Sequence, residues 1–188
     1  MRSGLERLAY ALMITIVATL CGWLIALIVN FQPENFAALG LSPLVLMLLR
    51  LPASFFGVYG FSMMFNSSQR LAITSGLIGA VANTLRLELV DFHTIPAPAA
   101  AFCGALVAGL LASIVNRTNG FPRISLTVPS IVIMIPGLYI YRGIYNIGLN
   151  QIGTGALWLT RAALIILFLP LGLFVARYLL DKEWRHFD

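Results

Sequence analysis

The sequence carries very little charge. It has 12 Lys or Arg and 7 Asp or Glu among 188 residues, so only 10% of the chain is charged, whereas a soluble domain is about 25% charged. Hydrophobic residues make up 60% of the positions. Because too few polar side chains are present to cover a water-facing surface, a sizeable soluble domain is excluded. Lipid is the expected solvent for most of the chain.

Residue types that carry catalysis or bind metals are also scarce. Cys21 and Cys103 lie in apolar runs, and we interpret them as packing residues rather than as a disulfide or metal ligands. His93, beside Asp91, is interpreted as a solvated loop residue rather than a proton relay. The sequence shows no Ser-His-Asp set, metal-ligand cluster or glycine-rich phosphate loop. Because an active site needs such groups to converge, we expect no enzyme, no metal and no cofactor.

Long apolar runs dominate what remains. Each is long enough to cross about 30 Å of hydrocarbon at about 1.5 Å per residue, and none shows the alternation of a membrane barrel strand. The runs cover residues 8–29, 41–65, 71–90, 98–115, 124–147 and 155–180. They predict an all-α fold: one membrane domain over residues 1–188, built as a polytopic transmembrane helix bundle of about six spans. The first run is too long for a signal peptide and lacks a small-residue cleavage site, so we expect it to be retained.

The basic residues predict how these helices are oriented. With the N-terminus inside, the three outer loops (32–40, 91–97 and 148–154) contain no Lys or Arg, and the cytoplasmic segments contain Arg2, Arg7, Arg70, Arg117, Arg123, Arg177, Lys182 and Arg185. Positive charge gathers on the cytoplasmic side of membrane proteins. We therefore expect both termini in the cytoplasm, with the protein in the inner (cytoplasmic) membrane. The net charge of +5 reflects this asymmetry and not nucleic-acid binding.

Four arginines fall inside the runs, all in the predicted outer half of the membrane: Arg50, Arg86, Arg142 and Arg161. A charge at such depth costs about 3 kcal/mol on the insertion scale. One interpretation is a positively charged vestibule that attracts carboxylates or other anions. The alternative is interfacial snorkelling for Arg86 and Arg142, with Glu88 and Asp91 as local counter-ions. The two are balanced for Arg86, whereas the depth of Arg50 and the position of Arg142 favour function.

A helix break is predicted in Val128-Pro-Ser-Ile-Val-Ile-Met-Ile-Pro-Gly137. Pro136 removes a backbone donor and clashes with the carbonyl four residues earlier, and Gly137 adds freedom. Broken helices in transporters line substrate cavities, although a passive kink is the alternative. Directly after the break, Tyr139, Arg142 and Asn146 share one helical face. The residues predicted to bind substrate are Arg142, Tyr139, Pro136, Gly137, Asn146 and Arg50.

Small residues recur every four positions in the fourth run, at Ala100, Gly104, Ala108 and Ala112. Such a ladder lets another helix approach closely. It predicts a packing seam, either within the chain or against a partner.

Two stretches resemble a known family. Gly60-Phe-Ser-Met-Met-Phe-Asn66, followed by Arg70 and Leu77-Ile-Gly-Ala80, is similar to the start of the second half of the threonine/serine exporter family. The segment from Val128 to Arg142 resembles the proline-glycine-tyrosine signature of that half. The similarity extends over residues 42–180 and leaves residues 8–29 as an extra N-terminal helix.

The resemblance implies a secondary exporter of small amino acids, such as threonine and serine, or of small dicarboxylates such as succinate. It also implies coupling to the proton gradient. In this family the two halves are either fused or separate, so a separately encoded membrane subunit resembling the first half is the expected partner. Two alternatives stay open: a passive channel or pore subunit, and a structural assembly subunit with no transport role of its own.

Overall fold

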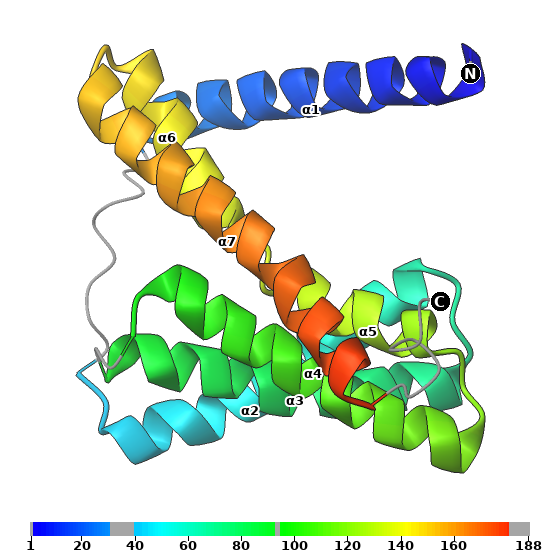
Figure 1. Cartoon of the computed structure of the whole chain (residues 1–188). Helices are drawn as coiled ribbons and strands as arrows, with labels where there is room; N and C mark the ends of the chain where they lie inside the picture. The colour runs from blue at the N-terminus through cyan, green and yellow to red at the C-terminus, as the bar shows by residue number, and fades with distance from the viewer. Residues whose placement is uncertain (1, 31–39, 93–94, 181–188) are drawn as a thin grey trace. The chain divides into compact units, whose positions relative to one another are not determined.

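The computed structural model describes residues 2–30, 40–92 and 95–180, and within these ranges it contains helices and no strand (Figure 1). The helices are α1 (Arg2–Ile28), α2 (Pro43–Met64), α3 (Gln69–Asp91), α4 (Ala97–Asn119), α5 (Arg123–Val132), α6 (Gly137–Gly148) and α7 (Ile152–Leu180). Five are long and apolar enough to cross a membrane; α5 and α6, bent by 41° at the break between them, form either one broken span, which makes six, or a re-entrant segment. The predicted all-α bundle is confirmed. Residues 32–39, His93, Lys182 and Arg185 lie outside the described residues.

The chain divides into two compact units, which are described separately. The smaller unit consists of Met1–Leu39 and Leu138–Leu159, and the larger unit consists of Gly40–Gly137 and Thr160–Asp188. In the smaller unit, Trp23 of α1 packs on Gly148 at the end of α6, where an added Cβ would lie 2.8 Å from the indole ring. The single membrane domain over residues 1–188 stays a prediction.

The larger unit is organised around α3, which contacts α2, α4 and α5; Figure 1 shows α2, α3 and α4 lying together. Small residues permit this close approach. Gly79 packs on Val58 of α2, and a Cβ on Gly76 would lie 2.9 Å from the ring of Phe55. Because the helices nearly touch, dispersion contacts between them are dense, which is how apolar helices associate in lipid.

The predicted seam on α4 is buried along its length: Ala100, Ala108 and Ala112 have no exposed surface, and Gly104 is also buried. A Cβ on Gly104 would lie 3.1 Å from the carbonyl oxygen of Ala82 in α3 and 3.2 Å from Sδ of Met134. The seam therefore serves contacts within the larger unit.

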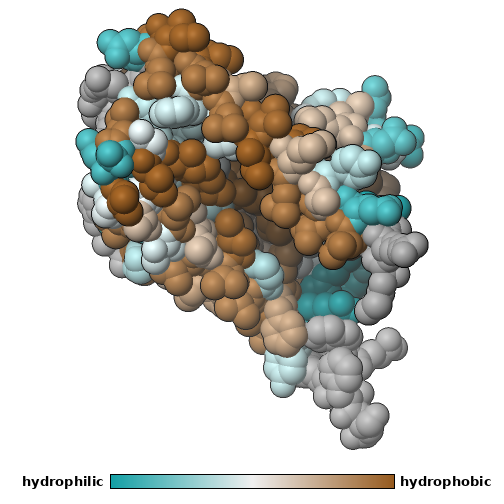
Figure 2. Space-filling view, turned by 90° about the horizontal axis from the view of Figure 1, so that it is seen from above, coloured by the Kyte–Doolittle hydropathy of each residue, from teal (hydrophilic) through white to brown (hydrophobic). Residues whose placement is uncertain are grey.

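The outer faces of the helices are covered with large apolar side chains. Phe56 is 68% exposed and Leu167 is 62% exposed, and Figure 2 shows hydrophobic side chains over much of the visible face. Water would disfavour so much exposed apolar surface. Lipid accommodates it, as expected for helices that cross a membrane.

The close contact at Gly104 predicts a specific defect. Gly104→Leu should lower the free energy of unfolding by about 1–3 kcal/mol, because overpacking forces the helices apart. Gly60→Leu in α2 is the matched control, since nothing lies within 4 Å of a Cβ at that position. The thermal midpoint of the purified protein in detergent measures both. Equal thermal midpoints in the two variants would contradict the close helix contact at Gly104.

Candidate functional site

The predicted helix break is present between α5 and α6. Pro136 is buried there. In place of the hydrogen bonds between residues four apart that define an α-helix, Ile135 N donates to Val132 O, three residues earlier, at 3.1 Å, and Gly137 N donates to Ile135 O, two residues earlier, at 2.8 Å. By contrast, Pro52, Pro129 and Pro170 lie inside continuous helices. A proline alone does not interrupt a helix in this protein. The break occurs where a glycine follows the proline.

Arg86 of α3 reaches the backbone of the break. Its Nη1 donates a hydrogen bond to the carbonyl oxygen of Met134 at 3.1 Å, and the Met134 side chain is fully buried. A buried carbonyl with no donor costs several kcal/mol in an apolar medium. From the sequence, snorkelling to the interface and a functional role were equally supported for Arg86. The structure shows it bound to an irregular segment of backbone, a role that sequence reasoning missed.

Polar side chains are buried one turn before Arg86. Asn83 is 4% exposed and donates from Nδ2 to Ser54 Oγ of α2 at 2.9 Å. On the α5 side, Ser130 Oγ donates to the carbonyl oxygen of Ser75 at 3.1 Å. These bonds tie α3 to the helices on both sides of it. They hold the helix that carries Arg86 in a defined position.

Arg142 and Tyr139 of α6 meet on one tryptophan in the smaller unit. The guanidinium carbon of Arg142 lies 4.8 Å from the ring centroid of Trp158 in α7. The ring of Tyr139 meets the same indole edge to face, with centroids 5.3 Å apart. A cation over an indole face is stabilised by the ring quadrupole. Trp158 was not singled out from the sequence, and only its place near the start of the last apolar run could have pointed to it.

Asn146 and the glycines of α6 and α7 lie where these two helices pack on each other. Asn146 is 2% exposed, and its Nδ2 donates to the carbonyl oxygen of Arg142 at 2.8 Å, one turn earlier. A Cβ on Gly143 would lie 2.7 Å from Leu159, and one on Gly155 would lie 2.7 Å from the carbonyl oxygen of Gly143. The two helices thus pack backbone to backbone, which brings Trp158 within reach of Arg142.

Arg50 forms ion pairs in the larger unit. Its Nη1 lies 2.8 Å from Oε1 of Glu88, and its Nη2 pairs with the carboxylate of Asp91. The acids therefore act as counter-ions of Arg50, and a substrate carboxylate would have to compete with both. Arg161 lies exposed on α7. Substrate binding by Arg50, like that by Arg142, Tyr139, Pro136, Gly137 and Asn146, stays a prediction.

The contact between Arg86 and the break predicts non-additive stability effects. Arg86→Met should lower the free energy of unfolding by about 1–3 kcal/mol, because the Met134 carbonyl loses a donor. Adding Pro136→Ala, which restores a backbone N–H to the break, should recover part of the loss. Thermal midpoints of the single and double variants measure the coupling, with Arg70→Met at an exposed position of the same helix as control. Strictly additive effects would contradict the contact.

Comparison with known proteins gives the family. A family model described as Threonine/Serine exporter, ThrE matches residues 50–179, which is more than half of the chain. No curated protein and no solved structure matched the chain. The match begins within α2, ends within α7 and leaves α1 outside. The apolar helices and this match together make the chain a multi-pass membrane protein, and it belongs to the threonine/serine exporter family.

Proposed function

We propose that the chain is a substrate-handling subunit of a secondary exporter for small amino acids, threonine and serine, or for small dicarboxylates. The family match supports export as the activity. The proposal includes a separately encoded membrane subunit that resembles the first half of the family. It also includes a location in the cytoplasmic membrane with both termini inside, because the basic residues between the apolar runs all fall on the side that this orientation makes cytoplasmic.

The observation that carries the proposal is the position of Arg142. It lies on α6, with its guanidinium carbon 4.8 Å from the ring centroid of Trp158. A guanidinium donates hydrogen bonds from its edge, so binding a carboxylate is compatible with lying over an indole. Amino acids and dicarboxylates both carry the carboxylate that this geometry would recognise.

The helix break supplies a second element of the proposal. Pro136 and Gly137 directly precede α6 in the sequence, so a change of backbone geometry at the break would move the helix that carries Tyr139, Arg142 and Asn146. Discontinuous helices serve this purpose in secondary transporters. The hydrogen bond from Arg86 would hold the α5 side of the break during such a change.

The Arg50 cluster supplies a route to proton coupling. Glu88 and Asp91 lie on a membrane helix and both pair with Arg50. Protonation of either acid would weaken its pair with Arg50. In this proposal Arg50 becomes available to an anion only when the acids take up protons, which would link substrate and proton binding.

Substitution of Arg142 tests the substrate role. Arg142→Gln should reduce export at least about tenfold, because a charge-assisted hydrogen-bonded pair is lost. Arg142→Lys should restore only part of the activity, since an ammonium cannot form the bidentate pair. Efflux of labelled threonine or succinate from cells that contain the partner subunit measures both, at matched protein levels. Arg7→Gln, at an exposed position of α1, is the control. Full activity in Arg142→Gln would remove Arg142 from the substrate site.

Substitution of Pro136 tests the break. Pro136→Ala should leave stability unchanged or raise it, because a backbone donor is restored, while export falls. Pro170→Ala in α7 is the matched control, since it restores a donor within a helix that is already continuous. Thermal midpoints and efflux rates are measured for both variants. Unchanged export in Pro136→Ala would identify the break as a passive kink.

A further inference from the structure

An open cavity of about 510 Å³ lies in the larger unit beside the first turns of α3. Its lining combines polar and apolar side chains: Arg70, Ile73 and Thr74 of α3, Asn119 of α4, and Phe121. The volume is in the range of small-molecule pockets, about 300–1,000 Å³. None of the roles proposed above for Arg142, Arg50 or the helix break involves this cavity.

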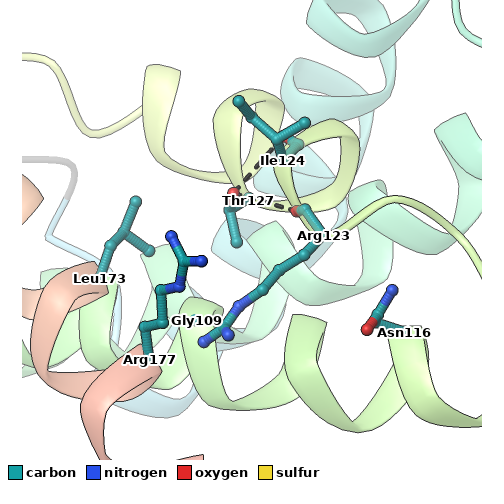
Figure 3. Close-up of a pocket in the computed structure, with 7 residues that line it drawn as sticks. All are labelled: Gly109, Asn116, Arg123, Ile124, Thr127, Leu173 and Arg177. Carbon is teal, nitrogen blue, oxygen red and sulfur yellow. Dashed lines mark hydrogen bonds between the residues drawn. The ribbon is translucent and has the colours of Figure 1, made fainter. Parts of the chain in front are cut away.

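Arg70 gives the cavity a positive charge. It is exposed, and among the residues that the structure describes its side chain has no ion-pair or hydrogen-bond partner. By contrast, Arg123 and Arg177, which line the separate cavity of Figure 3, already have partners within the protein. The described lining around Arg70 contains no carboxylate that would neutralise it. The first turn of α3 adds the positive end of a helix dipole.

Local hydrogen bonds hold the walls of the cavity in place. Gly120 ends α4 with a φ of 69°, a left-handed conformation that favours glycine, and its N–H donates to the carbonyl oxygen of Asn116 at 3.0 Å. Asn116 Nδ2 in turn donates to the carbonyl oxygen of Phe121 at 2.6 Å. On the α3 side, Thr74 Oγ1 donates to the carbonyl oxygen of Arg70 at 2.8 Å. None of these bonds uses the guanidinium group of Arg70.

An exposed apolar stripe on α3 begins at the cavity. Its members recur every four residues and are all exposed: Ile73, Leu77, Val81 and Leu85. The stripe is about 18 Å long at about 1.5 Å per residue, and one leaflet of a bilayer contains about 15 Å of hydrocarbon. An acyl chain whose headgroup lies at Arg70 can therefore follow this α3 stripe as far as the bilayer midplane.

We infer that the cavity binds the phosphate of an anionic phospholipid, with one acyl chain along the α3 stripe. A guanidinium group forms charge-assisted hydrogen bonds to phosphate, and the amide of Asn119 offers further donors. A zwitterionic headgroup would bring an ammonium group for which the described lining has no carboxylate, so an anionic headgroup is favoured. Under the orientation proposed above, this end faces the cytoplasm, whose leaflet carries a negative surface potential. Lipid binding here does not depend on the proposed export.

Binding to the purified full-length protein tests this site without transport. Protein stripped of lipid in detergent is mixed with phosphatidylglycerol, phosphatidylethanolamine or inorganic phosphate. Native mass spectrometry measures the lipid retained, and the thermal midpoint is measured in parallel. Phosphatidylglycerol should be retained in preference to phosphatidylethanolamine and should raise the midpoint, because it binds only the folded protein. Equal retention of the two lipids would overturn the site. An equally large midpoint shift with inorganic phosphate would identify a soluble anion as the ligand and overturn the assignment to lipid.

Variants locate the binding. Arg70→Gln should weaken binding of phosphatidylglycerol about fivefold or more, and Arg70→Lys should weaken it less, because the charge stays. Arg117→Gln is the matched control, since it removes the same charge from the last turn of α4, outside the cavity lining. Without lipid, Arg70→Gln should have the thermal midpoint of the unmodified protein, because Arg70 is exposed. Equal binding in Arg70→Gln and the unmodified protein, or an equal loss in Arg117→Gln, would overturn the site.

Discussion

Inside a lipid bilayer, every backbone amide and carbonyl must find its partner within the protein, and the break between α5 and α6 interrupts the helical hydrogen bonds that would provide those partners. The hydrogen bond from Arg86 gives the Met134 carbonyl within this break a donor. It depends in turn on α4, because a side chain at Gly104 would lie 3.1 Å from Cβ of Arg86 and 3.2 Å from Sδ of Met134. A glycine on one helix, an arginine on a second and an irregular segment of a third therefore form one arrangement.

The arginines within the helices meet the cost of burial in different ways. Arg50 is paired with two carboxylates, Arg86 binds a backbone carbonyl, and Arg142 lies over a tryptophan. The first environment neutralises the charge, whereas a carbonyl dipole or an aromatic quadrupole stabilises a cation without cancelling it.

Much of the fold could be predicted from the sequence, because the length of an apolar run and the position of Pro136 and Gly137 depend on local chemistry alone. The partners of each helix could not. The five long helices have little separation of polar and apolar faces, so periodicity does not show which face meets which neighbour. The contact between Arg86 and Met134 joins residues 48 positions apart, and the tryptophan under Arg142 lies on the next helix.

The central claim is that this chain takes part in energy-coupled export, and efflux against a concentration gradient tests it most directly. Cells that contain the chain and the proposed partner subunit are loaded with labelled threonine or succinate and placed in medium that already contains the same compound at higher concentration. The account predicts net efflux that stops when a protonophore collapses the proton gradient. Efflux that only equilibrates the two concentrations, and that the protonophore leaves unchanged, would contradict the account and identify a passive pore.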